Sequence, residues 1–323
     1  MIRIEDNNGK KIYIGFSTDK DIRYKATSGG VGTSIIKYLF EHNKIDYALS
    51  FEFNNKELKY HPCLISNFND YNICGSVYQE MDMLKFYRQK FNESLSGRRI
   101  ALFTLPCQTS FVKSLAKRYG IDIFIIGLTC SSQQDFKATD YLFKRIKVKT
   151  KDVSFYQYRG NGWPSGIQIS LNDSSKKYIP NNGSIWTKIF HSRLFIQKRC
   201  FKCQDTLNRN SDIVLADPWL KEYTSSERIG KTLFSAYTSR GQEVVADCLK
   251  LNYLSAEIIE DDKLINSQKS TIERKLSYKK NPKYRDFLIF LVNNSIYRLL
   301  VLHSKYFFDA HIKFRTWLEK SMR

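Results

Sequence analysis

The sequence has little proline or glycine and no long hydrophobic run. Of its 323 residues, 6 are proline and 15 are glycine, which excludes collagen-like and low-complexity linker proteins. No stretch approaches 18 uncharged apolar residues, so we expect no membrane-spanning helix. Residues 1–6 are polar and lack the apolar segment of a secretory signal. We therefore expect a globular protein of the cytoplasm, where cysteines stay reduced.

Acidic residues are scarce relative to basic ones. Asp and Glu number 32 against 52 Lys and Arg, which gives a net charge of +20. Such a surface attracts polyanions, anionic lipid or an acidic protein partner. No nucleic-acid-binding module accompanies the charge, so we do not expect nucleic acid as the partner.

The basic excess is concentrated near the end of the chain, where residues 273–323 hold 12 Lys or Arg and 4 Asp or Glu. Aromatic residues recur there at helical spacing: Tyr284, Phe287, Phe290 and Tyr297. We favour the interpretation that they pack against the rest of the protein, beneath a solvated basic face. The other interpretation is peripheral contact with the inner membrane through this basic region.

Short apolar runs alternate with segments of helical spacing, which predicts an α/β fold. The fold class we expect is a mixed sheet core with covering helices, plus a basic helical C-terminal region. We divide the chain into an α/β part (residues 1–150), an α+β part (151–263) and a basic helical tail (264–323). The expected strands are residues 11–16, 45–53, 98–104, 121–129, 153–158, 166–171, 177–179 and 211–217.

Seven cysteines suggest metal or redox chemistry for some of them. Cys107 and Cys130 each follow a predicted strand, and ligand sites of open α/β sheets lie beyond such strand ends. Cys200 and Cys203 form a Cys-x-x-Cys pair that can chelate one metal or one iron–sulfur cluster. Zinc would accept the same four thiolates. We favour the cluster because the ligands are scattered over some hundred residues, unlike a compact zinc ribbon.

The remaining cysteines, Cys63, Cys74 and Cys248, are interpreted as small buried apolar residues. We expect His61, Pro62 and Cys63 to lie in a loop.

The turn formed by residues 28–33 is rich in glycine and precedes a predicted helix. Glycines let the backbone approach a phosphate, and the helix N-terminus offers free N–H groups to an anion. The alternative is a helix-capping turn with no ligand.

Taken in order, these motifs resemble the coenzyme F420 hydrogenase/dehydrogenase beta-subunit family. The resemblance covers about residues 12–245 and rests on order and spacing. The matching pieces are Ala26-Thr27-Ser28-Gly29-Gly30, Gly75-Ser76-Val77-Tyr78, Leu105-Pro106-Cys107-Gln108, Leu128-Thr129-Cys130, Tyr158-Arg159-Gly160-Asn161-Gly162-Trp163, Cys200-x-x-Cys203, Ser211-Asp212-Ile213-Val214-Leu215-Ala216-Asp217-Pro218-Trp219 and Gly230-Lys231-Thr232-Leu233.

The resemblance implies an oxidoreductase with FAD and a 4Fe-4S cluster. It implies Cys107, Cys130, Cys200 and Cys203 as cluster ligands. Arg159 and Asp217 would orient flavin or substrate as catalytic residues. The residues implied for flavin binding are Ser28, Gly29, Gly30, Thr33, Tyr78 and Trp163.

Some positions depart from the family pattern. Ser131-Ser132 stands where the family has His-Gly, Ala216 replaces a glycine and Leu105 replaces a threonine. The chain also begins without the ferredoxin-like segment of many relatives, so we expect a separate ferredoxin-like electron donor. These departures resemble divergent bacterial members whose genes lie among surface-polysaccharide genes.

Two hypotheses follow. The first is a flavin and iron–sulfur reductase in polysaccharide or cell-envelope precursor metabolism, acting on an anionic small-molecule or lipid-linked substrate. The second is a non-redox scaffold of the same fold, with zinc or no metal, that binds a glycan-transferase partner or an anionic membrane.

Overall fold

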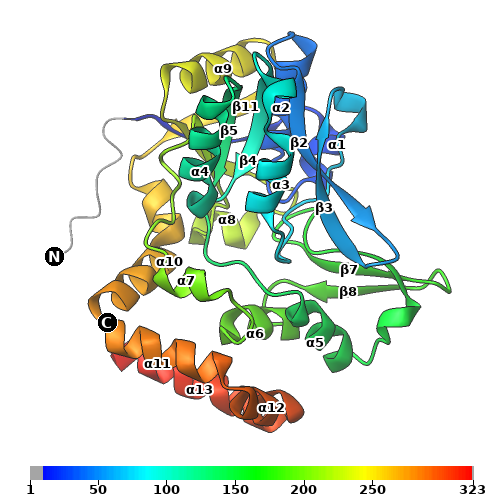
Figure 1. Cartoon of the computed structure of the whole chain (residues 1–323), viewed down its shortest axis with the longest axis vertical. Helices are drawn as coiled ribbons and strands as arrows, with labels where there is room; N and C mark the ends of the chain where they lie inside the picture. Colours follow the sequence, from blue (N-terminus) through cyan, green and yellow to red (C-terminus); the bar gives the residue numbers. More distant parts are fainter. Residues whose placement is uncertain (1–9, 322–323) are drawn as a thin grey trace.

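The computed structural model describes residues 10–321, and its centre is one mixed sheet of eight strands (Figure 1). The strand order is β11-β1-β10-β9-β5-β4-β2-β3, with β9, β5, β4 and β2 parallel and the other strands antiparallel to their neighbours. The strands are β1 (Ile12–Ser17), β2 (Tyr47–Asn54), β3 (Lys59–Ile65), β4 (Arg99–Thr104), β5 (Asp122–Leu128), β9 (Ile213–Ala216), β10 (Thr232–Ala236) and β11 (Leu254–Ile259).

Helices cover both faces of this sheet, as the apolar run of β5 predicts. Phe124 and Ile126 of β5 pack in the core under α2 (Val31–Glu41) and α9 (Ser239–Lys250). Ile125 packs in a second core, with α3 (Met83–Lys90) and α4 (Pro106–Arg118). The α/β prediction with a mixed, covered sheet is confirmed. Two short helices, α1 (Lys20–Lys25) and α8 (Lys221–Ser226), lie beside it.

A second sheet of three antiparallel strands packs against the far end of the β2–β3 hairpin, where Tyr60 Oη donates to Tyr156 O at 2.8 Å (Figure 1). Its strands are β6 (Val153–Gln157), β7 (Gly166–Leu171) and β8 (Lys176–Pro180). They share a core with α5 (Lys137–Arg145), α6 (Ile185–Ser192) and α7 (Lys198–Lys202). The chain then returns to the large sheet through β9, β10 and β11, so strands from both sides of residue 150 complete one sheet.

The loop expected at residues 61–63 is wrong, because His61, Pro62 and Cys63 lie in β3. Proline cannot donate to a sheet ladder, and it argued against a strand in the sequence. The structure tolerates Pro62 because β3 is the outermost strand and pairs only with β2.

Four helices follow the sheet and carry the basic C-terminal region (Figure 1). They are α10 (Lys263–Lys280), α11 (Pro282–Asn293), α12 (Ser295–His303) and α13 (Lys305–Ser321). No one helix among the described residues is long and apolar enough to cross a membrane. Taken together, α11 and α12, bent by 70° at their junction, have the length and composition to do so.

The expected packing of the aromatic residues holds for only half of them. Tyr284 and Tyr297 pack against the core that includes α5, α6 and α7. Phe287 and Phe290 are exposed, at 44% and 62%, so the prediction is wrong for these two. A helical repeat reports which residues share a face, and here apolar residues lie on both faces of the helix.

Candidate iron–sulfur pocket and buried ion pair

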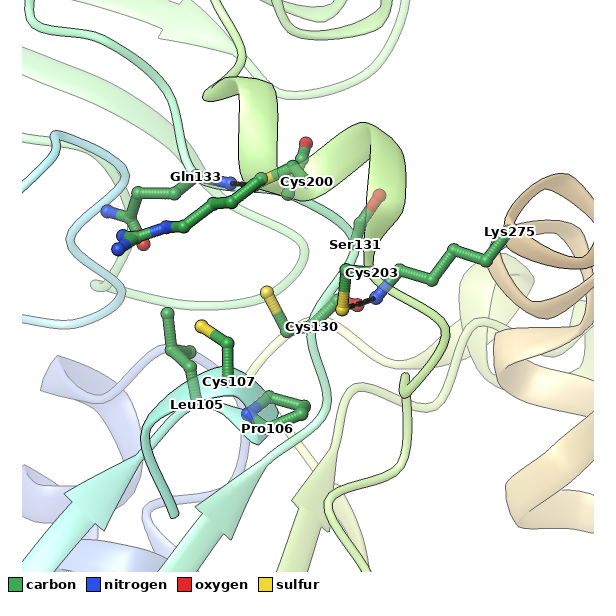
Figure 2. A pocket seen from close by; sticks show the side chains of 11 residues that line it. Leu105, Pro106, Cys107, Cys130, Ser131, Gln133, Cys200, Cys203 and Lys275 are labelled. Atoms are coloured by element: carbon green, nitrogen blue, oxygen red, sulfur yellow. Dashed lines mark hydrogen bonds between the residues drawn. The ribbon is translucent and has the colours of Figure 1, made fainter. Parts of the chain in front are cut away.

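The four predicted ligand cysteines line one pocket (Figure 2). Cys107 lies in the first turn of α4, directly after β4, and Cys130 follows β5 by two residues. Cys200 lies in α7, and Cys203 ends that helix. Because β4 and β5 are parallel neighbours, their carboxyl ends bring Cys107 and Cys130 to the same sheet edge. Figure 2 shows α7 bringing Cys200 and Cys203 to the opposite wall.

Backbone hydrogen bonds fix the Cys130 wall of the pocket. The Cys130 N–H donates to Thr206 O at 2.9 Å, and Thr129 N–H donates to Leu215 O of β9 at 3.0 Å. On the other wall, Gln133 N–H donates to Cys200 Sγ at 3.5 Å. Hydrogen bonds to ligand sulfurs tune the reduction potential of iron–sulfur clusters.

A buried lysine that sequence reasoning missed completes the pocket. Lys275 of α10 is 2% exposed. Its Nζ donates to Cys130 O at 2.9 Å, to Cys203 Sγ at 3.5 Å and to Asp205 O at 2.6 Å. Its local sequence is an ordinary basic helix, and only the tertiary fold turns this position inward.

Burial raises the pKa of two of the pocket thiols, Cys107 and Cys130. Burial raises the pKa of Cys130 to about 12, although the positive charge of Lys275 opposes the shift. A metal centre that binds thiolates must displace these protons. The ammonium of Lys275 and the guanidinium of Arg199, which also lines the pocket, supply positive charge for that state.

The donor set fits a cluster better than a lone ion. Among residues 10–321, no group of three or more His, Cys, Asp or Glu side chains is close enough to hold one metal ion. A zinc ion requires its four sulfurs at about 2.3 Å from a common centre. A four-iron cluster holds its thiolates farther apart, around a larger body. Four cysteines that line one pocket are a donor set that fits such a cluster.

The other three cysteines lie away from this pocket. Cys248 is fully buried and Cys74 is 9% exposed, and burial raises the pKa of each to about 12. Cys63 is half-buried, and burial raises its pKa to about 11. These neutral thiols pack as apolar side chains, as the sequence predicts.

The predicted catalytic pair, Arg159 and Asp217, forms an ion pair at the neighbouring strand end. Asp217 directly follows β9. Arg159 Nη1 and Nη2 donate to the two Asp217 oxygens at 2.5 and 3.2 Å, and Nη2 also donates to Thr27 O at 3.1 Å. Arg159 is 1% exposed. Trp163 Nε1 donates to Asp217 Oδ1 at 3.1 Å, so the pair is enclosed.

Other residues of the matching motifs surround this pair. The Tyr78 hydroxyl hydrogen-bonds to Arg159, and burial raises the pKa of Tyr78. Trp219, the last residue of the motif that contains Asp217, lies 5.2 Å from the Trp163 ring, centroid to centroid. Gly75 has φ +67°, and a Cβ there would lie 2.1 Å from Arg159 O. Motifs far apart in sequence thus meet around one guanidinium.

The glycine-rich turn docks on β10. Gly29 N–H donates to Thr232 Oγ1 at 2.8 Å, and Ser28 Oγ lies 3.0 Å from the same oxygen. Gly30 precedes α2 in the left-handed region, with φ +75°, and Thr33 is buried within α2. The Ser28 hydroxyl and the Gly29 N–H are therefore hydrogen-bonded to Thr232 within the protein. The roles implied for Ser28, Gly29, Gly30, Thr33, Tyr78 and Trp163 toward a flavin stay predictions.

Comparison with known proteins decides the family. Residues 12–87 match the model of the coenzyme F420 hydrogenase/dehydrogenase beta subunit N-terminus, and residues 97–262 match that of its C terminus. The chain belongs to this family. The matched regions contain all four pocket cysteines and the Arg159–Asp217 pair, whereas Lys275 lies beyond them.

Two curated relatives are beta subunits of F420-dependent formate dehydrogenases. The one from Methanococcus maripaludis is 24% identical over 254 residues, which cover 76% of this chain and 61% of the relative. The one from Methanocaldococcus jannaschii is 24% identical over 244 residues, covering 74% and 59%. The chain thus spans about three fifths of the length of these relatives.

A solved structure of the F420-reducing [NiFe] hydrogenase complex from Methanosarcina barkeri contains a chain with the same fold. The TM-score is 0.65 at 18% sequence identity, over 86% of this chain and 94% of that one. This likeness supports the fold described above.

Proposed function

We propose that this chain is an iron–sulfur oxidoreductase whose resident 4Fe-4S cluster is held by Cys107, Cys130, Cys200 and Cys203. One observation carries the proposal: four cysteines from three separate segments line one pocket. The family membership supports it, since the two curated relatives are subunits of dehydrogenases. A cluster bound here supplies one-electron transfer.

The residues around the pocket differ from one side to the other. Gln133 and Lys275 donate hydrogen bonds to two of the sulfurs. Lys275 also ties the Cys130 wall to the segment after Cys203, through the carbonyl oxygens of Cys130 and Asp205. Cys107 is the most exposed of the four cysteines. We infer that electrons enter past Cys107, since transfer needs one side of the pocket close to the surface.

The finer parts of the function are also proposals. A separate ferredoxin-like donor fits the net charge of +20, because an acidic protein is drawn to a basic surface. The same charge suits an anionic nucleotide-linked or lipid-linked substrate of polysaccharide or envelope synthesis. FAD at the Ser28-Gly29-Gly30 turn is a proposal that rests on the family resemblance.

Anaerobic purification tests the proposal. We expect broad absorbance near 400 nm, about four irons and four sulfides per chain, and a signal in electron paramagnetic resonance after reduction. Cys200→Ala should remove the absorbance, whereas the matched control Cys248→Ala, at another buried cysteine, should keep it. A colourless protein with one zinc or no metal would contradict the proposal and favour the non-redox scaffold.

A further inference from the structure

Three arginines lie buried together where α6, α10 and α13 meet. Arg193 ends α6, Arg274 belongs to α10 and Arg315 belongs to α13. Their exposures are 5%, 3% and 5%. The Arg274 guanidinium lies 5.7 Å from the Tyr278 ring centroid, and the Tyr278 hydroxyl donates to Glu319 Oε1 at 3.0 Å. We call Arg193, Arg274 and Arg315 the arginine cluster.

The charge of the arginine cluster is not balanced by the protein. Among the described residues, Glu319 is the carboxylate whose charge acts on Arg193 and that forms an ion pair with Arg315. Three guanidinium groups against one carboxylate leave a net +2 in a buried space. This excess of positive charge lowers the pKa of basic groups in and beside the cluster. Burial, then the charges of Arg274 and Arg315, lowers the pKa of Arg193 to about 9. Desolvation, then the charges of Arg193, Arg315 and Arg274, lowers the pKa of His191 beside the cluster.

The cluster also holds hydrogen-bond donors with no acceptor. Enclosed nitrogens without a hydrogen-bond partner are Arg193 Nε and Nη1, Arg274 Nη1 and Arg315 Nε, while Arg315 Nη1 contacts Glu319 Oε1. Buried charges in proteins are paired and hydrogen-bonded, because an uncompensated one is strongly unfavourable. Four unpaired donors on three buried arginines are the complement of an anion with several oxygens.

We propose that the arginine cluster binds a phosphate group. Guanidinium forks match the oxygens of phosphate and carboxylate in geometry. A phosphate monoester carries a charge of about −1.5 to −2 at pH 7, which balances the net +2, whereas one carboxylate would leave half of it. Arg274 and Arg315 lie beyond residue 262, the last residue of the family match, so the site belongs to the C-terminal helices of this chain.

The phosphate site adjoins the cysteine pocket. Arg274 Nη2 donates to Ser131 O at 3.1 Å and to Ser131 Oγ at 3.0 Å, and Ser131 lines the pocket beside Cys130. The next residue, Lys275, donates to Cys203 Sγ. Two consecutive residues of α10 thus serve the two sites. A role as anchor for a phosphorylated substrate rests on the proposed function, while phosphate binding itself does not.

Phosphate titration of the purified full chain tests the site, with or without a cluster. We expect millimolar phosphate to raise the melting temperature by several degrees beyond chloride of equal ionic strength. Arg193→Gln and Arg274→Gln should each weaken phosphate binding at least tenfold in calorimetry. Lys313→Gln, at an exposed lysine of α13, should bind as the natural chain does.

The variants separate ligand binding from a structural role. Removing one unbalanced buried charge should leave the phosphate-free protein as stable as before or more stable, while the response to phosphate disappears. Tighter binding of a nucleoside diphosphate than of inorganic phosphate would assign the site to a larger ligand, and equal binding to the free anion. A melting temperature that phosphate does not raise, or unchanged affinity in both glutamine variants, would overturn the proposal.

A separate observation concerns the outer face of α11, α12 and α13, at one end of the molecule (Figure 1). Large apolar side chains there are more than half exposed: Phe290, Ile296, Leu299, Leu300, Tyr306 and Trp317. On α12 the spacing of Ile296, Leu299 and Leu300 puts all three on one face. Patches of this kind mark protein or membrane contacts.

The charges around this face favour an anionic surface. Each acidic residue of the three helices forms an ion pair: Asp286 with Arg285, Asp309 with Lys188 and Glu319 with Arg315. In contrast, the exposed lysines of these helices form no ion pair within the described residues. They are Lys283, Lys305, Lys313 and Lys320. Apolar and aromatic side chains flanked by free lysines are typical of helices that lie in a lipid interface.

We infer that this face docks on an anionic lipid bilayer. The combined length and apolar composition of α11 and α12 agree with a segment that enters the interface. The chain should sediment with vesicles that contain phosphatidylglycerol and weakly or not at all with phosphatidylcholine alone. Leu299→Asp should abolish sedimentation, whereas Ile258→Asp, at an exposed apolar residue of β11, should not.

Gel filtration and light scattering supply the opposing outcome. If the natural chain forms a dimer that Leu299→Asp converts to monomer, and neither binds vesicles, a second copy covers this face and the lipid proposal is overturned. Vesicle binding that persists in Leu299→Asp would overturn it too.

Discussion

Arg159 and Asp217, 58 residues apart in sequence, form an ion pair through both carboxylate oxygens. The guanidinium is inaccessible to solvent, and it also holds the carbonyl of Thr27. Three motifs that look independent in the sequence are therefore organised by one buried charge. With so little of Arg159 exposed, its direct role is to position Asp217 and the glycine-rich turn.

Removing the partner of a buried charge is costly. Asp217→Asn should lower the free energy of unfolding by about 3–5 kcal/mol, because Arg159 stays buried without a counter-charge. Asp122→Asn provides the control, since Asp122 pairs with Arg240 at the surface and such pairs contribute about 0–1 kcal/mol. Urea denaturation of the two variants measures the difference. Equal losses would show that the Arg159 charge is compensated elsewhere.

Gly75 and Gly97 have similar φ angles, so alanine substitutions at the two positions distinguish the cost of backbone strain from the cost of a steric clash. Gly75 has φ +67° and Gly97 has φ +72°, yet a Cβ at Gly97 meets nothing within 4 Å. Gly97→Ala should cost about 1–2 kcal/mol for the left-handed backbone. Gly75→Ala should cost about 1–3 kcal/mol more, because its methyl group collides with Arg159 O. Thermal unfolding of both variants checks this order, and a smaller cost at Gly75 would contradict it.

Lys275 should tune the cluster that we propose. Its ammonium lies by Cys203 Sγ and favours the more negative, reduced state. Lys275→Gln should lower the reduction potential by about 50 mV, the one-electron equivalent of about 1.2 kcal/mol. Lys269→Gln, at an exposed lysine of the same helix, should change it by much less. Redox titration followed by absorbance distinguishes these results. An unchanged potential with full iron content would limit Lys275 to a packing role.

His191 should make stability fall in acid. Desolvation, then the charges of Arg193, Arg315 and Arg274, lowers the pKa of His191 in the folded protein, although the side chain is exposed at the end of α6; the unfolded value is about 6.5. The unfolded chain therefore takes up a proton first as the pH falls below about 6.5. Because solvent screens the charges around the exposed ring, stability should drop by less than about 1.4 kcal/mol per pH unit below that pH. Above pH 6.5 the histidine contributes no slope.

Urea denaturation of His191→Gln between pH 7 and pH 4.5, in a buffer free of phosphate, isolates this contribution. The variant should lack that part of the slope. Parallel curves for the two proteins would mean that His191 is accessible to protons in the folded state.

The four cysteines of the pocket can be predicted from the sequence, whereas the basic residues beside them cannot. Local patterns place Cys107 and Cys130 after strands, since an apolar run followed by a polar break marks where a strand ends. Cys-x-x-Cys spacing adds the second wall. Nothing local distinguishes Lys275 or Arg274 from exposed bases of the same helix, because their burial depends on the packing of α10 against α7.

The order of the strands in the sheet cannot be predicted from these local patterns either. Apolar runs report that β5 is covered on both faces, but not which strands flank it. Pro62 led to the wrong prediction of a loop in place of β3, because proline is excluded from central strands but tolerated in edge strands. The arginine cluster combines residues 193, 274 and 315, whose meeting point is set by three separate helices.

The position of β1 has a consequence for synthesis of the chain. Ile12 pairs with Ile259, and Tyr13 pairs with Phe234, so the first strand of the sheet is closed on both sides by the last two. At about 5–20 residues per second, a ribosome needs on the order of 10–50 s to supply those partners. During that interval β1 has two unpaired edges, which are a template for aggregation. The nascent chain should therefore depend on a holding chaperone until residue 259 has left the exit tunnel.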